Sequence, residues 1–230
     1  MSEGGAPVRH DFREILRLVR PGARVLDVGC GEGELLDLLR REKGVDGRGL
    51  ELRPEGVAAC LAKGLAVMQG DADRDLHEFP ADSFDYVVLS ETLQAVQNPR
   101  KVLGDLTRLA ERAVVSFPNF GHWRVRVSLA WRGRMPETRA LPEPWWSTAN
   151  IHLCTLSDFT ALADDLRLEI ESAAAVHRGR AAEPIAARSA LANLRAEHAL
   201  LLLRRREPAA AAAAASRGAV LPPRPGDLFG

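Results

Sequence analysis

The stretch VLDVGCGEGELL at residues 25–36 constrains the fold most, because it joins an apolar strand to a helix through a glycine-rich turn. Glycine allows a sharp turn and a close approach of the backbone to a ligand. The first turn of the following helix presents unpaired N–H groups and the positive end of a dipole. In an open α/β sheet, ligands bind beyond the carboxyl ends of the strands, where such turns lie. The motif therefore predicts a ligand site on a mostly parallel sheet.

Short apolar runs alternate with helical periods along most of the 230-residue chain. Because crossovers between parallel strands are right-handed, such an alternation winds into one open sheet. We therefore expect an α/β fold with a doubly wound, mostly parallel, seven-stranded, Rossmann-like sheet. The expected strands are residues 24–28, 49–52, 65–68, 84–90, 113–117, 168–170 and 199–203.

One domain, residues 11–206, accounts for this alternation. Residues 1–10 are predicted to be a flexible N-terminus, and the alanine- and proline-rich residues 207–230 a disordered tail, because such a composition cannot bury a core. Residues 118–154 interrupt the alternation and hold all four tryptophans, with five arginines against two glutamates. We interpret this segment as an insertion or lid. For its arginines alone, the alternative interpretation is a face exposed to solvent.

Composition narrows the classes of partner. Lysine plus arginine equals aspartate plus glutamate at 31 each, which argues against nucleic-acid binding by the whole protein. No apolar run approaches the ~18 residues of a membrane helix, so we expect no membrane partner. Three cysteines without a C-x-x-C pair favour a reducing cytoplasm and predict neither a disulfide framework nor a metal site.

The glycine turn favours S-adenosylmethionine (SAM), or its product S-adenosylhomocysteine, over a dinucleotide. Glu34 occupies the position of the third glycine in the dinucleotide pattern G-x-G-x-x-G, and Glu32 and Glu34 would both repel a pyrophosphate. Asp27 at the strand end suits an amine-bearing ligand. An NAD-binding oxidoreductase is the weaker alternative, which binding of NADH without binding of SAM would favour.

Two more carboxylates support a SAM site. Glu51 ends the second expected strand, where an acid can accept from both ribose hydroxyls, and Asp71 follows the third, near an adenine amino group. We expect Cys30 to pack in the turn and not to act as a nucleophile. The predicted cofactor-binding residues are Asp27, Gly29, Cys30, Gly31, Gly33, Glu51, Leu52, Asp71, Ala72 and Ser90.

No catalytic residue can be assigned from the sequence. The [DN]PP[YFW] element of nucleobase methyltransferases is absent after residue 88, and Ala95 replaces the histidine found in many small-molecule methyltransferases. Candidates for an acceptor pocket or a docking site for a partner are Asn119, His122, Trp123 and His152. The alternative is that the two histidines are packed and the tryptophans belong to the core or its rim.

Several stretches together resemble the methionine biosynthesis protein MetW family over residues 11–206. They are VLDVGCGEGELL, GLELRPEGVAAC, QGDADRDLHEFPADSFDYVVLSETLQAVQNP, VVSFPNFGHWRVR and NIHLCT. The resemblance implies the class I SAM-dependent methyltransferase fold and a bacterial cytoplasmic protein that works with a homoserine O-acyltransferase. It does not by itself imply methyl transfer. The alternative is an active SAM-dependent methyltransferase on an unidentified small-molecule acceptor.

Overall fold

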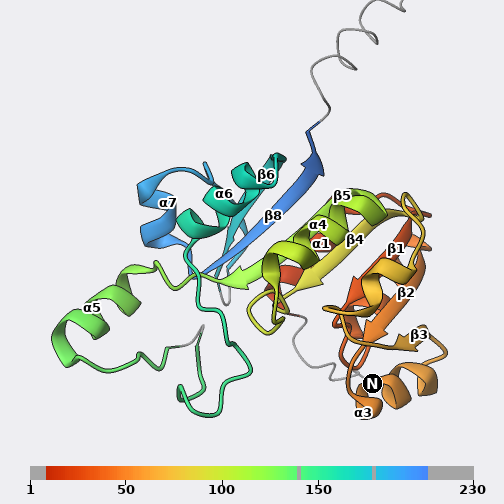
Figure 1. Cartoon of the computed structure of the whole chain (residues 1–230), viewed down its shortest axis with the longest axis horizontal. Coiled ribbons are helices and arrows are strands. Elements are labelled where there is room, and N and C mark those ends of the chain that lie inside the picture. Colours follow the sequence, from red (N-terminus) through yellow and green to blue (C-terminus); the bar gives the residue numbers. More distant parts are fainter. Residues whose placement is uncertain (1–8, 139–140, 178–179, 207–230) are drawn as a thin grey trace, which may run out of the picture.

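Eight strands form one sheet in the computed structural model, which describes residues 9–138, 141–177 and 180–206. They are β1 (Arg24–Val28), β2 (Asp46–Glu51), β3 (Ala66–Gln69), β4 (Phe84–Ser90), β5 (Ala110–Pro118), β6 (Leu168–Val176), β7 (Glu183–Pro184) and β8 (His198–Arg205). Their order across the sheet is β3-β2-β1-β4-β5-β8-β6-β7 (Figure 1). The expected doubly wound α/β architecture is confirmed.

The sheet is parallel from β3 to β5 and antiparallel beyond. β8 lies between β5 and β6 and is antiparallel to both, and β7 pairs with the outer side of β6. The expected count of seven strands was wrong by one, because β7 has only two residues. Glu183 and Pro184 form no apolar run that would have indicated a strand.

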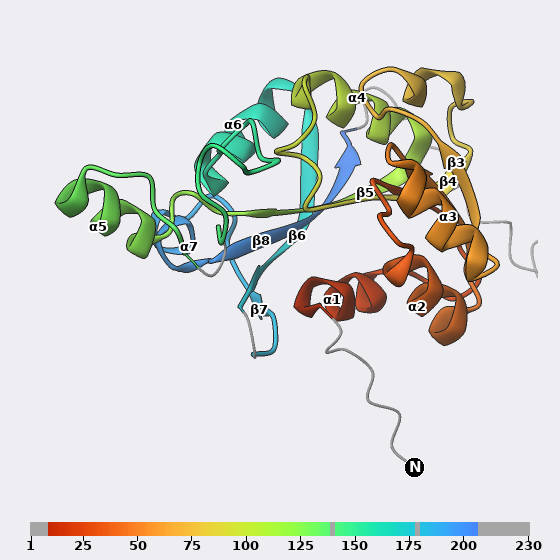
Figure 2. The same ribbon diagram turned by 90° about the horizontal axis from the view of Figure 1, so that it is seen from below.

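Helices cover both faces of the sheet. They are α1 (His10–Leu18), α2 (Glu34–Lys43), α3 (Pro54–Ala62), the 3-10 helix η1 (Asp75–Glu78), α4 (Pro99–Leu109), α5 (Trp123–Arg132), α6 (Leu156–Asp165) and α7 (Ala190–Arg195). The helices α4 and α6 lie on one face, and α1 and α2 on the other (Figure 2). Each face therefore has its own apolar core, and the inner strands are buried on both sides.

Local sequence signals set the ends of several helices. The Asn98 side chain accepts from Lys101 N at the start of α4. Thr155 and Asp158 form a reciprocal capping box at the start of α6. Gly44 ends α2 in the left-handed conformation. The caps at Asn98 and Thr155 fix where α4 and α6 begin, and Gly44 fixes where α2 ends before β2.

The two expected flexible ends, 1–10 and 207–230, lie outside the described residues except for Arg9 and His10. The tryptophan-rich segment at 118–154 contains α5, which lies far from β3 in both views (Figures 1 and 2). In the part of the chain that is described, no helix has the length and apolar character needed to cross a membrane.

Candidate functional site

The glycine turn joins the buried strand β1 to α2. Gly29 and Gly31 both adopt positive φ, at 74° and 56°. A Cβ on Gly29 would lie 2.5 Å from the Thr92 hydroxyl oxygen, so that only glycine fits there. A Cβ on Gly31 would meet no protein atom within 4 Å. The turn therefore packs against the loop after β4 at one residue and leaves open space beside the other.

Glu51 holds this turn against β2. Its Oε2 accepts from Gly31 N at 2.8 Å, and its Oε1 accepts from Arg53 N at 2.9 Å. Gly56 packs so closely behind this contact that a Cβ there would lie 2.8 Å from the Gly31 carbonyl oxygen. The buried carboxylate thus fixes the turn. Its Oε1 also accepts from Arg53 Nε at 3.3 Å, so Oε2 is the oxygen that keeps a further lone pair for a ligand.

Asp27 is a buried carboxylate near the end of β1. Within residues 9–138, 141–177 and 180–206, no group donates a hydrogen bond to it. Burial raises the pKa of Asp27 to about 7, with Arg9 opposing this shift and Asp11 and Glu51 adding to it. A buried, unpartnered carboxylate of this kind is stabilised by a cation.

Two hollows meet at Gly29. One, of about 220 Å³, is lined by Asp27 of β1 and by residues of the glycine turn, the start of α2 and the N-terminal segment. The other, of about 170 Å³, lies over the ends of β2 and β3. The first includes Arg9, Asp27, Cys30, Gly31, Glu32 and Ser90; the second includes Glu51, Leu52, Asp71, Ala72, Thr92 and Val96. The structure therefore brings together all the predicted cofactor-binding residues except Gly33, which packs behind the turn against Cys60 and Leu65.

The wall of the first hollow contains residues that the sequence analysis missed. Arg9 Nη2 lies 2.7 Å from Asp11 Oδ2 and 3.0 Å from both Ser90 Oγ and a Glu91 oxygen. Asp11 is buried and also accepts from Ser90 Oγ at 2.6 Å and from Ser116 Oγ at 3.3 Å. Asp11 could have been found, because its spacing places it on the apolar face of the first helix, four residues before Ile15. This network ties α1 to the ends of β4 and β5.

Glu91 extends this network from Arg9 to His198, at the start of β8. It directly follows β4 with φ of 55°, a conformation that non-glycine residues rarely adopt and that clusters at functional sites. Its carboxylate lies between Arg9 and His198, with Oε1 3.2 Å from His198 Nδ1. Because β8 is antiparallel to β5, its first residue, His198, reaches the carboxyl edge of the parallel strands.

One of the four acceptor-side candidates, Asn119, joins several elements of the protein. Asn119 Nδ2 donates to Asn193 O and Ala196 O at 2.7 and 2.9 Å. Its Oδ1 accepts from Gly121 N and Leu156 N at 3.0 and 2.9 Å. This buried amide thus uses both donors and both acceptors to join β5 to α6 and α7.

The other three candidates lie apart. His122 is buried and caps α5 by accepting from Arg124 N, and its burial lowers its pKa. His152 is exposed, 3.1 Å from Gln97 O, and Trp123 lies on α5. None of the four candidates lines either hollow.

The thiols offer no nucleophile at this site. Cys30 and Cys60 are buried with their sulfurs 3.9 Å apart, and burial is the main cause of the raised pKa of each. Cys60 donates to Gly31 O, which supports the turn from behind. Cys154 is a free thiol near Gln94. A thiol with a raised pKa is a poor nucleophile at neutral pH.

Two solved structures with the same fold are SAM-dependent methyltransferases. One from Thermotoga maritima has a TM-score of 0.63 at 13% identity, covering 86% of this chain and 88% of that one. One from Archaeoglobus fulgidus has a TM-score of 0.60 at 16% identity, covering 85% and 91%. The chain thus has the Rossmann-like fold of the class I SAM-dependent methyltransferases.

Comparisons of sequence identify the family to which the chain belongs. The family model for "Methionine biosynthesis protein MetW" matches residues 9–203, and the chain belongs to this family. A relative named bifunctional methionine biosynthesis protein MetXA/MetW, from Rhodopirellula baltica, is 33% identical over 170 residues. That match covers 70% of this chain and 27% of the relative. The ubiquinone biosynthesis O-methyltransferase of Hahella chejuensis is 38% identical over 109 residues, 46% of this chain and 45% of that protein.

Proposed function

We propose that the chain binds SAM across the two hollows and supports a homoserine O-acyltransferase in methionine biosynthesis. The observation that carries the SAM site is the unpartnered Asp27 carboxylate in a hollow that meets the Glu51 hollow at Gly29. The first hollow, with its Asp27 carboxylate, suits the methionine end of SAM. The second, with Glu51 and Asp71, suits the ribose and adenine.

The residues fit SAM group by group. Asp27 would accept from the ammonium of the methionine end, and the Arg9 guanidinium would face its carboxylate. Glu51 would accept from the ribose hydroxyls, while Asp71 and Ala72 would border the adenine. Ser90 and Cys30 complete the first hollow. When bound, SAM supplies an electrophilic methyl group on a sulfonium.

The Rhodopirellula relative supports the partner. Its name joins MetXA and MetW, and this chain aligns with only 27% of it, so one polypeptide combines a MetW part with a much larger remainder. Fusion of two activities in one chain favours association of the separate proteins. We place this role in the bacterial cytoplasm, where free thiols such as the three cysteines of this chain persist.

A calorimetric titration with SAM tests the site. We expect saturable binding by the wild-type chain and at least ~10-fold weaker binding by Gly31→Val, whose side chain would enter the open space beside the turn. Gly44→Val is the matched control, because Gly44 has a similar positive φ of 60° and a Cβ there also meets nothing within 4 Å, but the residue lines neither hollow. Binding of NADH in place of SAM would overturn the proposal.

An assay of the homoserine O-acyltransferase from the same organism tests the supporting role. We expect higher acyltransferase activity, or co-purification, when the chain is present. An acyltransferase that is equally active alone, and that does not bind the chain, would contradict this part of the proposal.

A second candidate function, methyl transfer to a small molecule, is favoured by the His198–Glu91 pair. The 3.2 Å contact with Glu91 would orient the imidazole at the carboxyl edge of the sheet. His198 could then accept the proton that an acceptor hydroxyl loses as its oxygen takes the methyl group. Formation of S-adenosylhomocysteine in a cell extract, lost in His198→Ala while SAM affinity is kept, is the expected result. No formation in any extract would exclude this function.

A further inference from the structure

The helix α5 differs from the other long helices in how little of it is buried. Of its ten residues only Val125 is buried, whereas α4 buries five of eleven. A ten-residue helix is marginal in water unless an apolar face packs against something. The apolar side chains of α5 therefore lack the cover that other helices of this molecule have.

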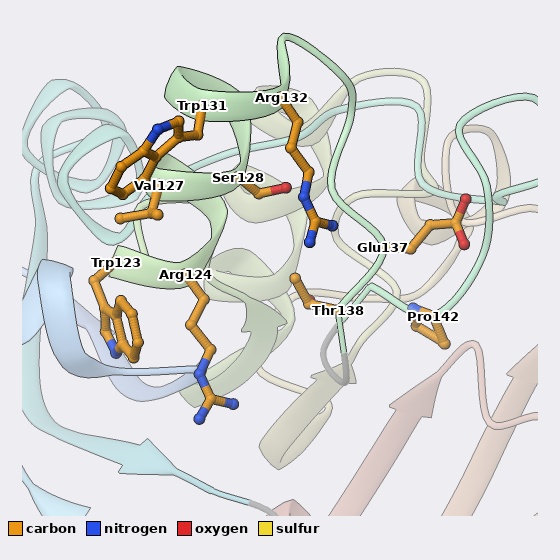
Figure 3. A pocket seen from close by; sticks show the side chains of 9 residues that line it. All are labelled: Trp123, Arg124, Val127, Ser128, Trp131, Arg132, Glu137, Thr138 and Pro142. Carbon is orange, nitrogen blue, oxygen red and sulfur yellow. The ribbon is translucent and has the colours of Figure 1, made fainter.

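Three of these side chains form one face. Trp123, Val127 and Trp131 follow one another at four-residue intervals, and 46%, 42% and 87% of their surfaces are exposed. Figure 3 shows them along one side of the helix. We call Trp123, Val127 and Trp131 the α5 face. Exposed aromatic residues grouped in this way are typical of protein-binding surfaces, where tryptophan is the commonest hot spot.

A large open cleft borders the α5 face. It has a volume of about 1000 Å³ and lies between α5 and the loop that carries Glu137, Thr138 and Pro142. Arg124 and Arg132 extend from α5 toward this loop (Figure 3). A partner could thus bury the three apolar side chains while its edge fills the cleft.

The charges around the face select the partner. The described part of the segment carries Arg124, Arg126, Arg132 and Arg134 against Glu137 and Glu143, and Glu197 lies 3.8 Å from Arg124, which leaves an excess of one positive charge. A second copy of this chain would bring the same excess to the interface, which opposes self-association. A different protein, with an apolar pocket and an acidic rim, complements the face.

The α5 face is also separate from the SAM site. None of the described residues of 118–138 and 141–154 lines either hollow, so the face can be occupied without covering the glycine turn. The relative that combines MetXA with MetW supplies the candidate occupant, because its chain keeps both parts together.

We propose that the α5 face docks the homoserine O-acyltransferase, with Trp123 and Trp131 inserted into an apolar, acid-rimmed pocket of that enzyme. This inference rests on the proposed supporting role and adds the surface that performs it. The arginines beside the face would then steer the acyltransferase during association, while the two tryptophans hold the complex together.

The test is a binding titration of the full chain with the acyltransferase of the same organism. We expect the double variant Trp123→Ala/Trp131→Ala to bind at least ~30-fold more weakly, as loss of hot-spot residues does. Its SAM affinity should stay within about twofold of wild type, because neither residue lines the hollows. Leu61→Ala on α3 is the matched control, since Leu61 is 59% exposed and far from α5.

The charge reversal Arg132→Glu provides a second variant that leaves both tryptophans in place. It should slow association, and the slowing should diminish at high salt. Salt-independent association of this variant at the wild-type rate would contradict the steering role.

The outcomes separate the two proposals. If the wild-type chain does not bind the acyltransferase, the supporting role is wrong and the docking assignment fails with it. If wild type and the double tryptophan variant bind equally well, only the docking assignment is wrong. Sedimentation that reveals a wild-type dimer absent from the double variant would assign the α5 face to a second copy and overturn the proposal.

Discussion

The glycine turn and the segment at 118–154 are built in opposite ways. In the turn, backbone and buried side chains are tied together, as in the contact of Glu51 with Gly31 N. In the segment, large apolar side chains such as Trp131 face outward. A small ligand is recognised by groups held in place before it arrives, whereas a protein partner is recognised by apolar surface that it can cover. The difference matches the two roles that we propose, with recognition of a small ligand at the turn and recognition of a partner at the segment.

Asn119 provides the largest test of this comparison. We expect Asn119→Ala to lower the free energy of unfolding by about 4 kcal/mol, because it removes four hydrogen bonds of a buried amide, each worth about 1 kcal/mol. Urea denaturation measures the change. SAM affinity of the folded variant should not change, and a large loss of affinity without a loss of stability would instead place Asn119 in a ligand site. Asn150→Ala is the control, since no hydrogen bond to that side chain occurs in the described residues.

Asp27→Asn tests the turn from the ligand side. We expect SAM to bind ~100-fold more weakly, because the buried carboxylate that faces the ammonium is lost. Thermal unfolding of the ligand-free variant should move to higher temperature, since the amide removes a charge that burial disfavours. Misfolding would lower both the SAM affinity and the temperature of unfolding, whereas this substitution should lower the first and raise the second. The exposed Asp46, changed to Asn, should leave both measurements unaltered.

The ionisation of Asp27 should make SAM binding depend on pH. The pKa of Asp27 in the folded protein is raised to about 7. A proton must therefore leave before the carboxylate can hold an ammonium, and affinity should fall by ~20-fold from pH 7.5 to pH 5.5. Calorimetry at several pH values measures this fall, and Asp27→Asn should show a flat profile.

The stability of the ligand-free protein should depend on pH in the opposite direction from SAM binding. Because the folded pKa lies above the unfolded one, the contribution of Asp27 to stability is fully present below pH ~4 and is lost as the pH rises through about 7. Unfolding of the ligand-free wild type and of Asp27→Asn should thus differ most above pH 7.

Trp131→Ala should have the smallest effect on the isolated chain. With 87% of its surface exposed, the side chain contributes little to folding, and the free energy of unfolding should change by less than ~0.5 kcal/mol. Phe159→Ala is the contrasting variant, because this ring is buried and its centroid lies 4.8 Å from that of Phe117. Its loss should lower the free energy of unfolding by about 3–5 kcal/mol. A strongly destabilised Trp131→Ala would mean that α5 is held by its tryptophans and is not a free surface.

The parallel part of the fold could be predicted because its signals are local. The strand, turn and helix of residues 25–36 and the caps at Asn98 and Thr155 each depend on a few neighbouring residues. The two-residue strand β7 lacks such a pattern and was missed. The six-residue helix α7 was missed as well, although the Ser189 side chain caps it. The grouping of Asp27, Glu51 and Asp71 also followed from the sequence, since the carboxyl ends of adjacent parallel strands meet at one edge.

The rest of the site could not be predicted because it depends on distant parts of the chain. Arg9 and Glu91 are about eighty residues apart, and His198 joins them only because β8 is antiparallel to β5. The same holds for Asn119, whose partners Asn193 and Ala196 lie on the last helix. Its polarity suggested a ligand contact, but a buried amide is equally suited to joining backbone segments.

The position of β8 between β5 and β6 has a consequence for synthesis of the protein. While the ribosome is still making residues 198–205, the facing edges of β5 and β6 both lack their neighbour. Unpaired edges of this kind invite pairing with other chains. The nascent polypeptide is thus most vulnerable to aggregation late in translation, and a substitution that slows insertion of β8 should reduce the yield of folded protein more than its effect on equilibrium stability would suggest.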